Sequence, residues 1–209
     1  VALVEEVAVR TWSEVERART EVLLRASEQR LQADLADAKV LQEVSATLIH
    51  EADDGALYQR LVEAATALMQ SQFASMQRLV HTPEGEAELE LLASAGFDEA
   101  ATRTWRRVPC TADTTCGAAV AAGKRIVESD IEAPTVLAGT PHVGTYRRLG
   151  IRAMQSTPLR ARDGRVVGVI STHWARPHVP PDRAIRLLDI LAREAADLLE
   201  QRQVRESLR

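Results

Sequence analysis

The stretch that decides the fold is residues 151–174, IRAMQSTPLRARDGRVVGVISTHW. Two apolar-rich runs flank Asp163-Gly164, a dipeptide that suits a two-residue type I′ turn. Such a turn places Arg162 opposite Arg165 and sets the register of the whole hairpin. That register predicts three cross-strand pairs on one face of a sheet: Met154 with His173, Ser156 with Ser171, and Pro158 with Val169.

The other face of this hairpin carries a second uncharged set: Ala153, Gln155, Thr157, Leu159, Ile170, Thr172 and Trp174. Because neither face is charged, we expect both to be covered. Terminal helices would cover one face, and residues 96–149 would lie over the other as a lid. A long segment closed over a sheet is typical of a ligand pocket, so we predict Met154, Ser156, Ser171 and His173 as pocket residues.

The rest of the central region alternates between helical and extended patterns. It predicts a helix over 56–71, strands over 73–80 and 88–95, a helix over 112–122 ended by Gly123, and a short strand over 125–128. Proline and glycine interrupt residues 129–149, which we expect to be irregular with brief helical pieces.

The two ends of the chain resemble each other. Residues 4–8 (VEEVA) align with residues 188–192 (LDILA), and both regions repeat apolar residues three and four positions apart, as amphipathic helices do. We interpret residues 1–27 as the exit helix of an upstream domain in a longer polypeptide, and residues 183–209 as the exit helix of this one. A chance likeness between two Arg- and Glu-rich helices is the alternative.

A helical pattern continues through residues 24–48, where Leu24, Leu31 and Ala38 follow a seven-residue spacing. This spacing favours a parallel homodimer through the terminal helices, and a lone helix packed on its own domain is the alternative. The expected organisation is a helical connector over 1–36, a central domain over 37–200 and the start of a further helix over 201–209.

Composition argues against several classes of function. A net charge of −4 without a basic cluster disfavours nucleic-acid binding, and no apolar run approaches the ~20 residues of a membrane-spanning helix. Two cysteines, Cys110 and Cys116, make no disulfide framework, so we expect a reducing cytoplasm. Aromatic residues are only 3% of the chain, which argues against a site built from several rings, and Trp105 is interpreted as a packing residue.

Several segments resemble GAF domains. Residues 73–79 (FASMQRL) and 91–97 (LLASAGF) resemble the first hairpin of that family, and residues 115–119 (TCGAA) with 126–131 (IVESDI) resemble its central helix and third strand. Residues 152–159, 168–174 and 187–193 resemble its closing elements. The resemblance covers about residues 37–200 and is strongest to GAF domains of bacterial multidomain sensor histidine kinases, which also carry PAS domains.

The resemblance implies an α+β fold. An antiparallel sheet of five or six strands would have terminal helices on one face and a small-molecule pocket on the other. Long helices at both ends would pass its state to adjacent PAS, GAF or kinase domains.

The chain also departs from several GAF subclasses. Cys116 is followed by Gly117 where bilin-binding phytochromes usually have histidine, although His173 falls where phytochromes place a pocket histidine. The asparagine–lysine signature of cyclic-nucleotide-binding members is missing. Free methionine-R-sulfoxide reductases need about three cysteines, more than the two present here.

Cys116, Asp130 and Tyr146 join the four hairpin residues as candidate ligand contacts. Cys116 lies near a helix start, where the helix dipole favours a thiolate, and a buried core cysteine is the alternative. Asp130 could polarise a ligand or cap a turn, and Tyr146 could close over a ligand or pack in the core. His173 could contact a ligand, or be a hydrogen-bonded histidine beside Met154.

We therefore expect a sensory or regulatory module and not an enzyme, because no phosphate loop, nucleophile elbow or kinase motif is present. The histidine spacing predicts no metal. The module would bind an unidentified small ligand, or only dimerise, and relay its state to an output domain such as a histidine kinase, with neither nucleic acid nor membrane as partner. The alternatives are a thiol-based redox switch or sulfoxide-reductase-like enzyme using Cys110 and Cys116, and a ligand-free dimerisation spacer.

Overall fold

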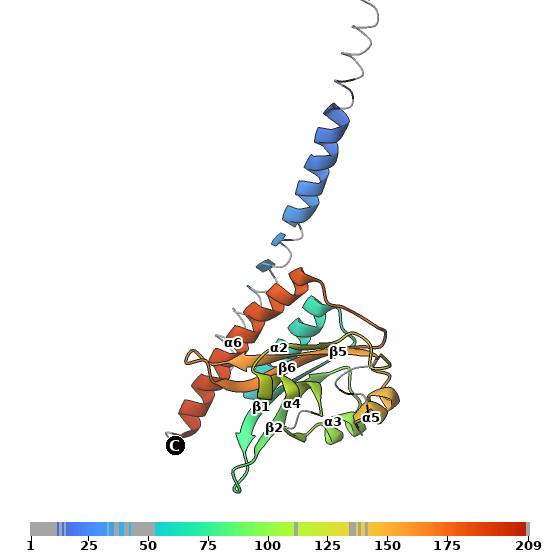
Figure 1. Cartoon of the computed structure of the whole chain (residues 1–209). Helices are drawn as coiled ribbons and strands as arrows, with labels where there is room; N and C mark the ends of the chain where they lie inside the picture. The colour runs from blue at the N-terminus through green and yellow to red at the C-terminus, as the bar shows by residue number, and fades with distance from the viewer. Residues whose placement is uncertain are drawn as a thin grey trace, which may run out of the picture. The chain divides into compact units, whose positions relative to one another are not determined.

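The computed structural model describes residues 12, 14, 16–32, 34–35, 38–39, 42, 53–110, 113–133, 137, 139–140 and 142–207. The chain divides into two compact units, residues 1–42 and 43–209. In the first unit, residues 16–32 are helical (Figure 1), and Leu24 and Leu31 are 57% and 63% exposed. Residues 4–8 of the expected repeat lie outside the described residues. The coiled-coil dimer therefore stays a prediction.

The second unit contains α2 (Asp54–Met69), β1 (Phe73–His81), β2 (Ala87–Ala95), α3 (Glu99–Thr104), β3 (Arg107–Pro109), α4 (Thr115–Ala122), β4 (Ile126–Glu128), α5 (His142–Arg148), β5 (Ala153–Arg160), β6 (Val166–Trp174) and α6 (Asp182–Ser207). The strands form one antiparallel sheet in the order β3-β2-β1-β6-β5-β4. Helices α2 and α6 cover one face, the helix face, and α3, α4 and α5 lie over the other, the lid face (Figure 1). The predicted α+β fold is confirmed.

Capping residues fix where the helices begin. The Asp53 carboxylate accepts a hydrogen bond from the Gly55 amide, so α2 starts two residues earlier than the periodicity predicts. The Thr114 hydroxyl accepts from the Gly117 amide at 3.0 Å and starts α4 at Thr115, later than the predicted residue 112. The predicted end of α4 at Gly123 is confirmed.

The turn of the β5–β6 hairpin has three residues, so the predicted two-residue turn is wrong. The Ala161 amide donates to the Arg165 carbonyl, and the Gly164 amide donates back to the Ala161 carbonyl, both at 2.9 Å. Gly164 takes a φ of 87°, the left-handed conformation that closes such loops. Arg162 consequently does not face Arg165, which avoids two like charges at opposed positions.

An irregularity between Leu159 and Arg160 then restores the predicted register. The observed pairs include Met154 with His173, Ser156 with Ser171, and Pro158 with Val169. Because the register holds, both predicted faces are confirmed. The helix face buries Leu61, Met76, Ile170, Leu188 and Leu191 in one cluster. The lid face buries Leu89, Val108, Leu137, Ile151, Met154 and Val169 in another.

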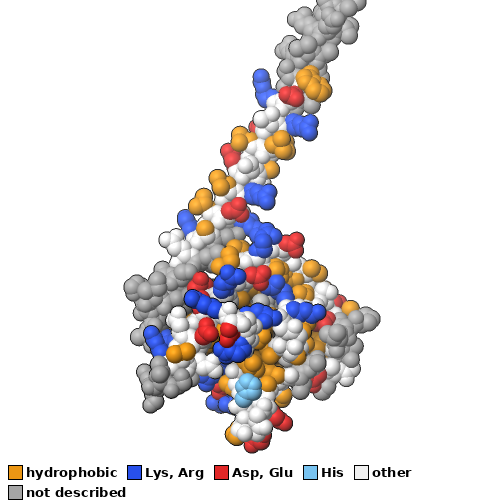
Figure 2. Space-filling view, turned by 60° about the vertical axis from the view of Figure 1, so that its left-hand side comes forward, with side chains coloured by type: hydrophobic (Ala, Val, Ile, Leu, Met, Phe, Trp, Pro, Cys, Tyr) orange, Lys and Arg blue, Asp and Glu red, His pale blue; other side chains and the backbone are white. Residues whose placement is uncertain are grey.

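The lid, residues 96–149, is more regular than expected. It contains helix α3 and strand β3, which the sequence pattern did not predict, and β3 extends the sheet beyond β2. The Arg107 guanidinium on β3 pairs with Glu88 at 3.3 Å and Glu90 at 3.2 Å on β2. On the surface of the second unit, acidic and basic side chains are interspersed on the face that Figure 2 shows.

Candidate functional site

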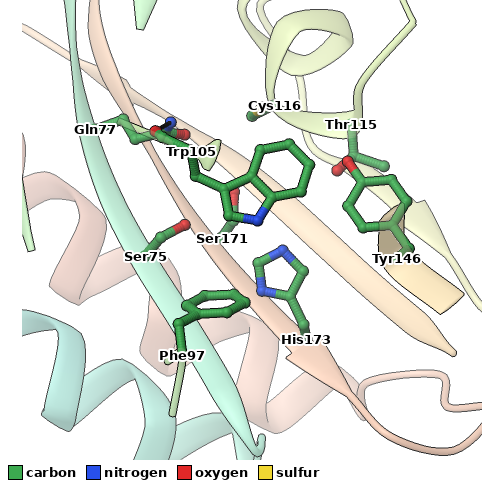
Figure 3. A pocket seen from close by; sticks show the side chains of 9 residues that line it. All are labelled: Ser75, Gln77, Phe97, Trp105, Thr115, Cys116, Tyr146, Ser171 and His173. Atoms are coloured by element: carbon green, nitrogen blue, oxygen red, sulfur yellow. Dashed lines mark hydrogen bonds between the residues drawn. The ribbon is translucent and has the colours of Figure 1, made fainter. Parts of the chain in front are cut away.

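A small cavity lies between the lid face of the sheet and the elements that cover it (Figure 3). Its lining combines hydroxyls, an amide, a thiol and several rings: Ser75, Gln77, Phe97, Trp105, Thr115, Cys116, Tyr146, Ser171 and His173. The centre of a water molecule can reach about 20 Å³ of it. That volume holds about one water molecule, so the cavity is closed to anything larger in this conformation.

The floor of the cavity comes from alternate residues of two paired strands. Ser75 and Gln77 of β1 lie on the same face as Ser171 and His173 of β6, and Ser75 is directly opposite Ser171. The Ser171 and Ser156 hydroxyls are 2.8 Å apart, which extends the polar floor to β5. Hydrogen bonds among neighbouring strands therefore hold these hydroxyls in fixed positions.

One wall of the cavity is the first turn of α4. The Thr115 hydroxyl accepts a hydrogen bond from Ser156 at 3.1 Å and donates to the Met154 sulfur at 3.4 Å. These contacts tie the start of α4 to β5. Met154 and Ser156, both predicted pocket residues, therefore lie beneath Thr115 and do not line the cavity themselves.

Aromatic rings close the rest of the cavity. Trp105, which follows α3, stacks on Tyr146 of α5 with ring centroids 5.3 Å apart. Phe97 meets His173 edge-on at 5.5 Å and stacks on Phe73 at 5.2 Å. The expectation that a chain with three Trp, two Tyr and two Phe would not build a multi-ring site is wrong. The few rings come together because separate segments converge on one space.

The lid is anchored to the floor by a long-range hydrogen bond. The side-chain amide of Gln77 on β1 donates to the Trp105 backbone carbonyl at 3.3 Å. Because Trp105 carries one of the stacked rings, this bond fixes the position of the aromatic cover. The Thr115 hydroxyl also interacts with the Tyr146 phenol, and burial raises the pKa of Tyr146, so the phenol stays protonated.

His173 is the most unusual polar group in the cavity. Its side chain is 7% exposed, and among the described residues its Nδ1 atom has no hydrogen-bond partner. Burial lowers the pKa of His173 from 6.5 to about 4, while an interaction with the Phe73 backbone acts in the opposite direction. The imidazole is therefore neutral at pH 7, and one ring nitrogen lacks the partner that a buried polar atom normally has.

Both cysteines lie in the lid-face cluster, but neither is activated. Burial raises the pKa of Cys116, and hydrogen bonding of the sulfur to the Thr114 hydroxyl, 3.3 Å away, opposes this only in part. Burial also raises the pKa of Cys110 to about 11. Of the two interpretations of Cys116, the buried core cysteine is the one observed, because desolvation outweighs the dipole of an eight-residue helix.

Asp130, like Met154 and Ser156, is a predicted site residue that does not line the cavity. It follows the short edge strand β4, accepts a hydrogen bond from the Glu132 amide at 3.1 Å, and pairs with the Arg152 guanidinium at 2.9 Å. The Arg152 hydrogen bond holds the pKa of Asp130 below its usual value. Its turn-forming role is thus the one observed, because its carboxylate accepts from the backbone amide two residues further along the chain.

Of the seven predicted site residues, the cavity brings together Cys116, Tyr146, Ser171 and His173. Ser75, Gln77, Phe97, Trp105 and Thr115 were not predicted. Ser75 and Gln77 carry a usable signal, since they alternate along a strand that pairs with β6. Among the residues that the structure describes, no three His, Cys, Asp or Glu side chains are placed to hold a metal ion. No helix within the described ranges is long and apolar enough to cross a bilayer.

The family model for the GAF domain matches residues 51–200, which span the sheet, the lid and most of α6. The chain belongs to the GAF domain family. No curated protein matches the chain. The GAF fold described above is one that sensory and regulatory proteins use.

Solved structures of GAF domains resemble this one in fold at low sequence identity. The GAF domain of a phosphoenolpyruvate-protein phosphotransferase from Coxiella burnetii has a TM-score of 0.67 at 13% identity, covering 82% of this chain and 96% of that one. Free methionine-R-sulfoxide reductase from Neisseria meningitidis has a TM-score of 0.60 at 22% identity, covering 80% and 91%. A domain of a putative two-component sensor histidine kinase from Sinorhizobium meliloti has a TM-score of 0.57 at 18% identity, covering 75% and 97%.

Proposed function

We propose that this GAF domain is a sensory module that binds a small molecule in the lid-face cavity and relays its occupancy through α6. The observation that carries the proposal is His173, which lines a cavity walled by rings and hydroxyls and whose buried Nδ1 atom has no partner among the described residues. An unpaired buried polar atom costs free energy, and a ligand that pairs with it removes that cost.

A chain of hydrogen bonds provides a route from the lid to α6. Arg125, between α4 and β4, donates to the Thr157 hydroxyl at 2.8 Å and pairs with Asp189 of α6. Thr157 in turn donates to Gln155 at 2.8 Å, and Gln155 donates to Thr172 at 3.0 Å. Displacement of α4 by a ligand would therefore move Arg125 relative to α6. Couplings of ~1–3 kcal/mol are typical of such relays.

The proposed transmission to neighbouring domains depends on the helices at the two ends of the chain. The 26-residue α6 exposes Ile190 and Val204, and the helix over residues 16–32 exposes Leu24 and Leu31. Apolar side chains on long helices suit a parallel homodimer through the terminal helices. We propose adjacent PAS, GAF or kinase domains in the same cytoplasmic polypeptide, an arrangement supported by the likeness to a domain of a putative sensor histidine kinase.

The ligand-free dimerisation spacer is the second candidate, and the small volume of the closed cavity favours it. The thiol-based alternatives receive less support, because the pKa values of Cys110 and Cys116 are both raised. A sensor and a spacer differ in whether a change inside the cavity reaches α6.

Filling the cavity tests the relay without knowledge of the ligand. Ser75→Met adds volume at the cavity floor, and Ser75→Ala removes the same hydroxyl without filling the space. Hydrogen exchange of the full 209-residue chain is compared among these variants and the wild type. We expect Ser75→Met, but not Ser75→Ala, to change the exchange of α6 amides around Asp189. Changes confined to β1 and α4 would support the spacer, and native mass spectrometry of the same samples reports dimers and any co-purified molecule.

A further inference from the structure

The chemistry of the cavity lining restricts the charge of its ligand. The nine lining side chains include no Lys, Arg, Asp or Glu, and the His173 imidazole is neutral because burial lowers its pKa to about 4. Asp113, the carboxylate that acts on the lining residues Tyr146 and Cys116, already lies 3.5 Å from the His142 ring. A buried carboxylate, phosphate or ammonium would find no opposite charge among the nine lining side chains, and an unpaired buried charge is strongly unfavourable.

The shape of the lining favours a flat molecule. The Trp105 and Tyr146 rings are nearly parallel, with an interplanar angle of 15°, and Phe97 meets His173 at 75°. Figure 3 shows the rings of Trp105, Tyr146, Phe97 and His173 around one space. Stacked and edge-on contacts with a planar guest reproduce the geometries that aromatic rings prefer.

His173 specifies a polar group on that molecule. A neutral imidazole offers one N–H and one lone pair, and the tautomer decides which of them Nδ1 carries. A hydroxyl or an amide both donates and accepts, so it pairs with a ring nitrogen of His173 in either tautomer. The Ser75 and Ser171 hydroxyls on the same floor offer further partners.

Because the cavity is small, part of its lining must move before a ring can enter. About 20 Å³ accommodates a water molecule but not a ring, so a planar guest must separate the Trp105–Tyr146 stack. The Gln77–Trp105 hydrogen bond at 3.3 Å resists that separation.

We infer that the cavity takes an uncharged planar small molecule bearing a hydroxyl or amide group, which enters by parting the Trp105 and Tyr146 rings and pairs with His173. This rests on the proposed function, whose cavity it describes. It adds the chemical class of the ligand and the lid contact that its binding breaks.

Three flat probes that share a fluorobenzene ring separate charge from hydrogen bonding: 4-fluorophenol, fluorobenzene and 4-fluorobenzoate. Fluorine NMR titrations with the full chain give a dissociation constant for each. We expect 4-fluorophenol to bind about tenfold more tightly than either of the others, since one hydrogen bond to a buried polar atom is worth about that factor. Ser75→Met should abolish binding, and His173→Leu should reduce the preference for 4-fluorophenol over fluorobenzene to less than about threefold.

Labelling histidine with nitrogen-15 provides a measurement that needs no variant. In the wild-type protein, 4-fluorophenol should shift the His173 ring nitrogen resonances, and fluorobenzene should shift them less. Equal affinity for 4-fluorophenol and fluorobenzene would overturn the role of His173, and tighter binding of 4-fluorobenzoate would overturn the uncharged class. If no probe binds but Ser75→Met still alters α6 exchange, the ligand class fails and the proposed function survives. If no probe binds and α6 does not respond, both fail.

Discussion

The two faces of the sheet are built from alternate residues of the same strands, yet they are covered in different ways. The helix face lies under α2 and α6, which are 16 and 26 residues long, and its buried Gln155, Thr157 and Thr172 are hydrogen-bonded to one another. The lid face lies under helices of six, eight and seven residues. It contains the cavity and the unpaired Nδ1 atom of His173.

This difference separates stability from binding within one domain. Long helices bury a continuous apolar stripe and contribute most of the folding free energy. Short elements held by a few hydrogen bonds open at lower cost, and ligand-binding segments are drawn from such regions. Substitutions on the helix face should therefore lower the free energy of unfolding. Substitutions on the lid face should change the pH dependence of stability, the reactivity of the thiols and the coupling between the cavity and α6.

The largest effect is expected at the centre of the helix face. Leu188 of α6 is fully buried, so Leu188→Ala should lower the free energy of unfolding by roughly 3–5 kcal/mol through lost transfer energy and the cavity it leaves. Ile190→Ala, two residues further along the same helix at a side chain that is 47% exposed, is the matched control and should cost less than about 1 kcal/mol. Urea unfolding measures both. Similar costs for the two variants would show that α6 is not packed as described.

The second effect depends on pH and concerns His173. Its folded pKa of about 4 lies below the ordinary 6.5, so between these values the unfolded chain takes up a proton that the folded chain does not. Stability should therefore fall as pH decreases from about 6.5 to 4. This decrease should be roughly 3 kcal/mol larger in the wild type than in His173→Asn.

The exposed residue His81 provides the control for that pH dependence. His81→Asn removes an imidazole from the surface and should keep the full wild-type slope. Urea midpoints measured between pH 4 and 7 give all three curves. Parallel curves for wild type and His173→Asn would mean that His173 is not buried in its neutral form.

The third prediction concerns thiol reactivity on the lid face. With its pKa raised from 9.0 to about 11, Cys110 has roughly 100-fold less thiolate at pH 8 than an ordinary thiol. A more basic thiolate is about tenfold more nucleophilic, so Cys110 should react with a disulfide reagent about tenfold more slowly, and buried Cys116 should be slower still. Stopped-flow measurements on Cys116→Ala and Cys110→Ala isolate the two thiols. Rapid reaction of either thiol in the folded protein would favour the redox alternative.

Local patterns were enough to predict the two faces. Alternation along β5 and β6 depends only on the period of a strand, so the pairs Met154–His173 and Ser156–Ser171 followed from the sequence. The prediction of a two-residue turn was wrong, because the three-residue turn depends on the bulge after Leu159. The Asp163-Gly164 dipeptide does not indicate that bulge. The register survived because the bulge compensates for the longer turn.

Most of the cavity lining could not be predicted from sequence patterns, because contacts between distant segments assemble it. Gln77 and Trp105 are hydrogen-bonded across the lid, and Trp105 stacks on Tyr146 from a third segment. The percentage of aromatic residues contains no information about such convergence. Strand β3 has three residues, too few for a period to be detected, and the edge position of Asp130 depends on how β4 ends.

The smallest expected effect tests whether the two faces are coupled. Arg125 follows α4, whose first turn lines the cavity, and its guanidinium reaches both the Thr157 hydroxyl and Asp189 of α6. The Asp189 side chain is 55% exposed, so solvent screens the ion pair, and a double-mutant cycle of Arg125→Ala and Asp189→Ala should give a coupling of about 0.5–1 kcal/mol. The informative comparison repeats the cycle in the cavity-filled Ser75→Met protein. If filling the cavity moves Arg125, the coupling should change while the cost of Leu188→Ala stays constant. An unchanged coupling would mean that the lid face and α6 respond independently, and that any signal leaves the domain by another route.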